Sequence, residues 1–139
     1  MAVIRIKEAE YSYDEVIEFA AGIIGFPELR SAALIPIPDF EPFYWLASLD
    51  DETTRFIVLN PREIYPEYSL QTPKEISSVI NSVDGIFAIV KISSDWEKTT
   101  VNLRAPIILN KELKKGVQLI LGDSEYRLYE ALPQNSTSC

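Results

Sequence analysis

Histidine is absent from this chain of 139 residues, and its single cysteine, Cys139, is the last residue. Without histidine, the chain lacks the usual proton shuttle of acid–base catalysis, every histidine-based triad and the commonest zinc ligand. With one cysteine it forms no intrachain disulfide, so nothing indicates an oxidising compartment. We therefore expect a cytoplasmic protein without histidine-based catalysis, cofactor or metal.

Long apolar runs and glycine-rich motifs are also missing. No stretch approaches the ~20 apolar residues that cross a bilayer. Residues 1–7 alternate charged and branched aliphatic side chains, unlike the continuous apolar region of a secretion signal. The five glycines form neither a P-loop nor a nucleophile elbow. We therefore expect no membrane partner and read residues 3–7 as the first strand.

Positive charge is scarce in the first half of the chain. Residues 1–60 hold 4 Lys or Arg against 11 Asp or Glu, which places −7 of the total −8 charge there. A phosphate backbone is repelled by such a protein, so we expect no direct binding of nucleic acid. A basic protein partner suits this charge better.

What is present indicates one mainly β domain. We expect the domain to span residues 1–132 and the polar segment 133–139 to be a flexible tail. Runs rich in branched and aromatic residues predict strands, with turn residues between many of them. The predicted strands are 3–7, 16–20, 33–37, 43–48, 55–60, 86–93, 99–109, 117–121 and 126–131. Their spacing predicts a compact antiparallel β-barrel or sandwich.

One short helix is predicted after residue 71. Thr72 can cap it, Pro73 suits its first position, and Glu75 completes a capping box. Its apolar stripe would be Ile76, Val79, Ile80 and Val83. A helical turn at residues 26–30 competes with a loop there, and Lys115-Gly116 reads as a hairpin turn.

Segment 101–110 is an apolar run interrupted by polar residues at fixed alternation. At period 2, one face would carry Val101, Leu103, Ala105, Ile107 and Leu109. The other face would present Asn102, Arg104, Pro106 and Asn110. Pro106 cannot donate to a sheet ladder, so we expect a sheet edge or a bulge there. The polar side chains could bind a partner's backbone at such an edge, or they could satisfy groups within the chain.

Two further groups could carry a site. Residues 43–46 alternate so that Tyr44 and Trp45 point to opposite faces, as in a strand buried on both sides; the alternative is an exposed aromatic anchor for a saccharide or peptide. Asp50 and Asp51 could be the paired carboxylates of a small hydrolase, or a solvated acidic turn. The predicted partner-binding residues are therefore Asn102, Arg104, Asn110, Tyr44, Asp50 and Asp51.

Several segments together have a familiar pattern. They are Gly-Ile-Ile-Gly-Phe-Pro-Glu-Leu at 22–29, Pro-Phe-Tyr-Trp-Leu-Ala-Ser at 42–48, Asn-Pro at 60–61, the apolar strand 86–92, Asn-Leu-Arg-Ala-Pro-Ile-Ile-Leu-Asn at 102–110, and Gly-Val-Gln at 116–118. In this order and at this length the chain resembles the FliW family of bacterial flagellar assembly factors. Ile24 stands where the family usually has proline, and Ala47 where it usually has glutamine.

The resemblance implies a compact β-barrel-like fold and a non-enzymatic regulator that exchanges protein partners. Members of the family bind flagellin, through its C-terminal helical region, and the RNA-binding translational repressor CsrA. While CsrA is held, it cannot repress flagellin messenger RNA. Newly made flagellin takes the FliW protein away and releases CsrA, so flagellin and CsrA are the partners that the resemblance implies here.

Overall fold

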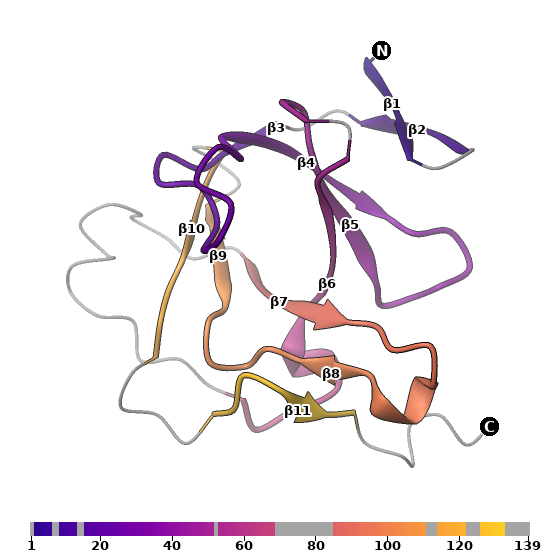
Figure 1. Ribbon diagram of the computed structural model, residues 1–139, viewed down its shortest axis with the longest axis vertical. Helices are drawn as coiled ribbons and strands as arrows, with labels where there is room; N and C mark the ends of the chain where they lie inside the picture. The colour runs from indigo at the N-terminus through magenta and orange to yellow at the C-terminus, as the bar shows by residue number, and fades with distance from the viewer. Residues whose placement is uncertain are drawn as a thin grey trace.

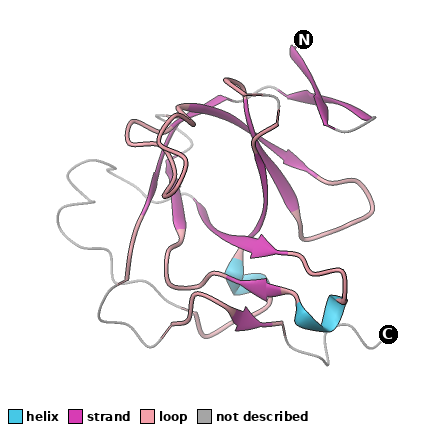
Figure 2. Cartoon of the chain, in the orientation of Figure 1, coloured by secondary structure: helices cyan, strands magenta, loops and turns pink. Residues whose placement is uncertain are grey.

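Eleven strands and two 3-10 turns make up the regular structure of the residues described by the computed structural model, which are 2–6, 9–13, 16–51, 53–68, 85–110, 114–121 and 126–132. The strands are β1 (Ala2–Ile6), β2 (Ala9–Tyr13), β3 (Val16–Glu18), β4 (Ser31–Pro36), β5 (Tyr44–Ser48), β6 (Arg55–Leu59), β7 (Gly85–Lys91), β8 (Thr100–Val101), β9 (Ile107–Asn110), β10 (Lys115–Gln118) and β11 (Glu130–Ala131) (Figure 1). The 3-10 turns are η1 (Pro61–Glu63) and η2 (Trp96–Lys98), drawn in cyan in Figure 2.

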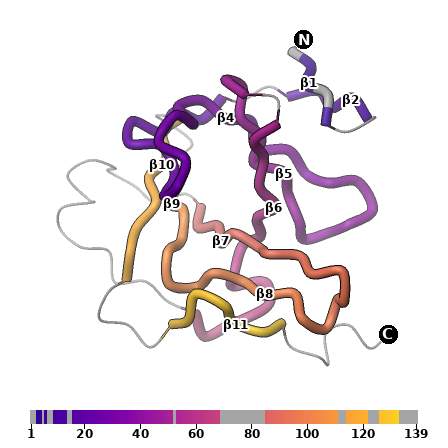
Figure 3. Tube along the Cα trace, in the orientation of Figure 1, coloured from indigo at the N-terminus to yellow at the C-terminus, as the bar shows by residue number. Residues whose placement is uncertain are grey.

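Seven strands close into a barrel. Antiparallel pairing joins β3 to β7 in sequence order, β9 pairs with both β7 and β10, and β10 pairs with β3 in parallel. Figure 3 shows the early, indigo part of the chain meeting the late, orange strands at this parallel seam. β8 and β11 extend the sheet beyond β7, and β1 and β2 form a separate hairpin. The predicted β-barrel-like fold is confirmed.

Alternate residues of the barrel strands fill its interior. The buried members of this interior cluster are Ile17, Phe19, Ile23, Leu29, Ala32, Leu46, Val58, Phe87, Ile107 and Leu109. Cross-strand pairs such as Leu34 with Leu46, and Phe87 with Ile107, place apolar side chains opposite each other, as the strand period of two requires. Gly116 faces the same interior, where an added Cβ would lie 2.5 Å from the Phe19 ring.

The hairpin of β1 and β2 covers one outer face of the barrel. Ile6 packs with the outward side chains Ala33, Ile35 and Ala47 in a small buried cluster. Trp45 and several neighbours are partly buried against that cluster; the others are Ile4, Tyr11, Tyr13 and Leu49. This hairpin therefore shields an apolar surface that would otherwise face water.

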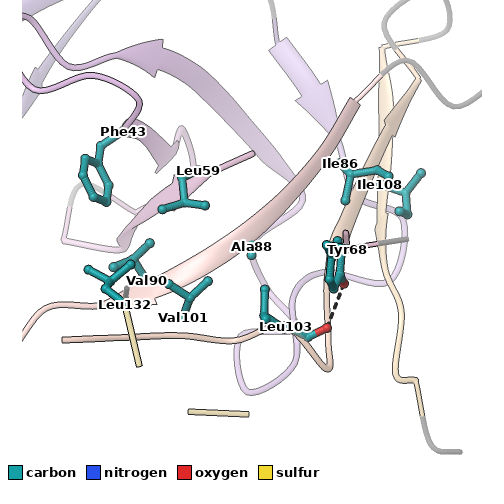
Figure 4. Packing of buried hydrophobic residues seen from close by; sticks show 10 residues of the cluster. All are labelled: Phe43, Leu59, Tyr68, Ile86, Ala88, Val90, Val101, Leu103, Ile108 and Leu132. Atoms are coloured by element: carbon teal, nitrogen blue, oxygen red, sulfur yellow. Dashed lines mark hydrogen bonds between the residues drawn. The ribbon is translucent and has the colours of Figure 1, made fainter. Parts of the chain in front are cut away.

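A larger apolar cluster lies on a second outer face, under η1, β8 and β11. Its buried members are Phe43, Leu59, Tyr68, Ile86, Ala88, Val90, Val101, Leu103, Ile108 and Leu132 (Figure 4). The Tyr68 hydroxyl donates to the Leu103 carbonyl at 2.7 Å inside this cluster. Strands β6, β7 and β9 are consequently buried on both faces.

Most predicted strands correspond to observed ones, with several differences. The run 99–109 is broken into β8 and β9, and the second strand of the N-terminal hairpin, β2, was not predicted. Lys115 and Gly116 lie inside β10, so the predicted turn there is wrong; the residue with positive φ is Lys114, at 56°. The predicted helix at 72–83 and the tail at 133–139 lie outside the described residues.

Candidate partner-binding site

Asn102 organises the break between β8 and β9. Its Oδ1 accepts hydrogen bonds from the backbone N–H of Arg104 at 3.1 Å and of Ala105 at 3.0 Å. Pairing with β7 moves from Val90 opposite Val101 to Phe87 opposite Ile107, so extra residues bulge out between these pairs. The bulge that Pro106 predicted is therefore present, and the side-chain oxygen of Asn102, Oδ1, has an internal role.

The backbone of this segment is not a free edge for a partner strand. The Leu119 N–H donates to the Pro106 carbonyl at 2.9 Å, and the Leu121 N–H donates to the Arg104 carbonyl at 2.8 Å. The Asn102 N–H donates to the Ile89 carbonyl at 2.9 Å. Addition of a foreign strand here would have to displace these bonds, which favours the internal role of this segment over a docking edge.

The presented polar face of the segment is also smaller than predicted. Asn110 is only 1% exposed, at the end of β9, and Pro106 is buried. Both faces of β9 are covered, because the barrel interior lies on one side and the outer cluster on the other. Asn110 therefore cannot contact a partner while the chain is folded, whereas Asn102 and Arg104 are partly exposed.

Tyr44 and Trp45 point to opposite sides of β5. Tyr44 packs on the interior cluster, edge-on to Phe87 with ring centroids 5.4 Å apart. Trp45 packs under the N-terminal hairpin, with the Arg55 guanidinium 6.0 Å from its ring centroid. The two rings cannot stack on one saccharide or peptide, so a joint aromatic platform is excluded by this geometry.

Asp51 holds the turn between β5 and β6, and Asp50 ties that turn to the start of β4. Asp50 Oδ2 accepts from the backbone N–H groups of Arg30 and Ser31, at 3.2 and 3.0 Å. Three hydrogen bonds lower the pKa of Asp51. The largest contribution comes from the backbone N–H of Thr53, which donates to Asp51 at 2.9 Å, followed by the hydroxyl of Thr53 and then the hydroxyl of Thr54. Both carboxylates thus accept from backbone N–H groups, which is a structural role and needs no catalytic pair.

Two hollows lie at opposite ends of β4. One of about 950 Å³ lies beside the loop 37–43 and is lined by Pro36, Phe40, Glu41, Pro42, Phe43, Tyr44, Asn60, Glu63, Ile64, Gly85, Phe87, Trp96 and Leu132. The other, of about 370 Å³, lies beside the loop 22–29 and is lined by Gly25, Phe26, Pro27, Glu28, Leu29, Ser48, Asp50, Asp51 and Thr54. Both combine aromatic side chains with carboxylates, which suits recognition of a protein better than a chemical reaction.

Sequence reasoning missed most of these lining residues, Phe26 and Phe40 above all. Phe26 is 45% exposed and Phe40 is 37% exposed, although both are aromatic. A signal was present at 22–27, where two glycines and a proline surround Ile24 and Phe26. Such turn-forming residues place neighbouring side chains on the surface even when those side chains are apolar.

The described residues contain no group of three or more His, Cys, Asp or Glu side chains placed to hold a metal ion. Among these same residues, no helix is long and apolar enough to cross a membrane.

Comparison with known proteins gives the family. The model of the FliW protein family matches residues 2–132. The chain belongs to the FliW family. It is 37% identical over 135 residues to the flagellar assembly factor FliW of Caldicellulosiruptor bescii, covering 94% of this chain and 88% of that protein. The FliW of Thermotoga maritima is 36% identical over 135 residues, covering 94% and 91% of the two chains.

A solved structure has the same fold. The crystal structure of a flagellar assembly factor FliW superimposes with a TM-score of 0.84 at 22% identity, covering 94% of this chain and 96% of that one. At this identity the similarity concerns the fold alone. This chain thus has the same overall fold as that FliW protein.

Proposed function

We propose that this chain is a cytoplasmic, non-enzymatic flagellar assembly factor that exchanges two protein partners. One partner is flagellin, bound through its C-terminal helical region, and the other is the translational repressor CsrA. When flagellin is scarce the chain holds CsrA, so flagellin messenger RNA is translated. When flagellin accumulates, it binds the chain in place of CsrA, and the released CsrA represses translation.

The match to the FliW family over residues 2–132 is the observation that carries this proposal. Relatives that cover most of the chain bear the name flagellar assembly factor FliW. The chain has no histidine, and the carboxylates that come closest to a catalytic pair, Asp50 and Asp51, accept hydrogen bonds from backbone N–H groups of the chain. A binding role is therefore favoured over a catalytic one.

Charge supports the choice of an RNA-binding partner. The chain has a net charge of −8, and a protein that holds RNA needs a basic surface for the phosphates. Opposite charges accelerate encounter and favour the correct orientation. An acidic chain docked on CsrA would also bring negative potential near the path of the RNA, which would disfavour RNA binding even without direct blockage.

The partner exchange is tested by competition in solution. The chain is incubated with purified CsrA, and flagellin is then added in steps while free CsrA is measured by size-exclusion chromatography. We expect flagellin to release CsrA in proportion to its concentration. A ternary complex in which neither partner weakens the other would refute the exchange.

A second arm tests the electrostatic contribution. The affinity of CsrA for RNA is measured with and without the chain, at about 50 mM and about 500 mM salt, because screening shortens the reach of charge as salt rises. We expect the chain to inhibit RNA binding less at high salt. Inhibition that is independent of salt would rule out a mainly long-range charge effect.

A further inference from the structure

The loop of residues 22–29, here called the Phe26 loop, is a rigid turn. Gly22 has a φ of 68°, and a Cβ there would lie 2.7 Å from the Pro27 Cα, so only glycine fits. Ile23 and Phe26 exchange two backbone hydrogen bonds, of 3.1 and 2.7 Å, around Gly25 at φ 84°. The Ile24 N–H donates a hydrogen bond to Oε1 of Gln118, on β10, at 2.8 Å. The shape of the loop is therefore fixed before any partner arrives.

This rigid loop presents apolar side chains to water. Ile24 is 54% exposed and Phe26 is 45% exposed. The Phe26 ring meets Phe56 edge-on at 5.0 Å, which fixes its orientation beside the hollow of about 370 Å³. A fixed, half-exposed aromatic ring beside a hollow is the type of side chain that dominates binding energy at protein interfaces.

The hollow is negatively charged. Glu28, Asp50 and Asp51 line it, and no lysine or arginine is among the described residues that do. The nearest cation in sequence, Arg30, lies outside this lining, and its Nε donates to the Pro27 carbonyl at 3.1 Å. Backbone N–H donors hold Asp50 and Asp51 in place without neutralising them. A partner that fits the hollow must therefore bring positive charge.

We infer that the Phe26 loop and its hollow form the docking surface for a basic protein segment, which inserts an apolar side chain beside Phe26 and sets lysines or arginines against Glu28, Asp50 and Asp51. This inference rests on the proposed function and assigns the surface to the RNA-binding partner, because that partner must carry a basic face. The three carboxylates would then occupy part of the surface on which the partner receives phosphates.

The other hollow provides a matched control. Phe40 and Glu41 lie in the loop 37–43, which leaves β4 at the end opposite the Phe26 loop (Figure 1). Six residues of β4 separate the two loops, a span of roughly 17–20 Å. Both loops thus carry an exposed phenylalanine with a glutamate close behind it, and only one of them faces Asp50 and Asp51.

The test compares two double variants, Phe26→Ala with Glu28→Gln, and Phe40→Ala with Glu41→Gln. Binding of purified CsrA is measured by isothermal titration calorimetry at about 100 mM salt. We expect the Phe26/Glu28 variant to raise Kd by about 30-fold or more, and the control to change it by less than about 3-fold. Equal effects, or a larger effect in the control, overturn the assignment of the surface.

Binding of CsrA by the unmodified chain distinguishes a failure of the proposed function from a failure of the assigned docking surface. If it binds no CsrA, the proposed function fails and this inference with it. If it binds CsrA and the Phe26/Glu28 variant binds equally well, the inference alone fails.

A single charge reversal, Glu28→Lys, covers the case in which loss of the ring disturbs folding. It should weaken CsrA binding at about 50 mM salt and have little effect at about 500 mM. Unchanged affinity at the lower salt overturns the inference, while a salt-dependent loss supports it.

Discussion

The β1–β2 hairpin and the β8–β11 pair each cover an outer face of the barrel, but only the second is hydrogen-bonded into the barrel sheet. β8 pairs with β7 and β11 with β8, whereas β1 and β2 pair only with each other in the described part of the chain. Beneath β8, the Tyr68 hydroxyl is bonded to Leu103. Under the hairpin, the buried Trp45 Nε1 has no hydrogen-bond partner among the described residues. One cover is thus part of the sheet, and the other is held by apolar contact.

This difference indicates that the two covers open at different free-energy cost. A two-stranded hairpin is marginal by itself and depends on the surface that it packs against. A cover that shares ladders with the barrel opens only when those ladders break. We therefore expect the hairpin to exchange amide hydrogens through local opening and the β8–β11 side through global unfolding.

The largest expected effect comes from removing a core side chain under each cover. Leu103→Ala, at a residue 3% exposed, should lower the free energy of unfolding by about 3 kcal/mol, since it leaves a cavity in the core. Ile6→Ala, at a residue also 3% exposed, should cost less, because loss of hairpin docking limits the effect. Urea denaturation of both variants checks this. Equal losses would show that the hairpin unfolds together with the barrel.

A smaller effect is expected from the buried hydroxyl under β8. Tyr68→Phe should cost about 1–2 kcal/mol, because it leaves the Leu103 carbonyl without its 2.7 Å donor. Tyr129→Phe, at a residue 65% exposed, is the control and should leave the melting temperature unchanged. A Tyr68→Phe variant as stable as the control would mean that this bond adds nothing to the cover.

Alkaline pH should destabilise the side of the barrel that β8 and β11 cover. Burial, and then the negative charge of Glu130, raise the pKa of Tyr65 to about 12, and burial also raises the pKa of Tyr68. The folded state therefore favours the protonated phenols. Their contribution to the free energy of unfolding is complete below a pH of about 10 and is lost as the pH rises toward 12. Denaturation from pH 8 to 12 should show this fall. The free energy of unfolding should fall less steeply with pH in a Tyr65→Phe, Tyr68→Phe double variant. An equally steep fall would contradict the role of these two phenols.

The smallest effect is expected at Trp45. Trp45→Phe removes apolar area and also removes the N–H that is buried without a partner, so the two contributions oppose each other. The free energy of unfolding should change by less than about 1 kcal/mol. The remaining tryptophan, Trp96, reports the transition by fluorescence. A loss of about 3 kcal/mol or more would mean that packing alone decides at this position.

Local pattern predicted most strands because branched and aromatic residues dominate them and turn residues separate many of them. Val101, Leu103, Ala105, Ile107 and Leu109 are all buried, but the prediction that they share one face is wrong. Val101 and Leu103 pack in the outer cluster, whereas Ile107 and Leu109 fill the barrel interior, because the break between β8 and β9 interrupts the alternation. The opposite face was misjudged at Asn110, because its burial depends on strands far away in the sequence. Alternation predicts which residues share a face only where a strand is unbroken, and it does not show whether a second layer covers the other face.

The sites were harder to predict than the strands. Asn102, Asp50 and Asp51 have polar atoms suited to binding, yet those atoms accept from backbone N–H groups of the chain. Asn102 and Asp51 do so within their own turns, and Asp50 does so at the start of β4. Phe26 is aromatic, and its 45% exposed ring follows from the loop conformation that Gly22 and Gly25 allow. A residue's chemical type therefore predicted a site less well than the conformation of its loop.

The parallel seam between β3 and β10 has a consequence for how the chain folds during synthesis. The seam has one paired position, Glu18 with Lys115, and close by Ile24 is bonded to Gln118, 94 residues later. Strands β3 to β7 can pair with sequence neighbours as they leave the ribosome, whereas closure must wait until β10 emerges. Contacts this distant in sequence form slowly. We therefore expect the newly made chain to pass through an open, curved sheet whose first strand, β3, keeps an unpaired edge until β10 has emerged.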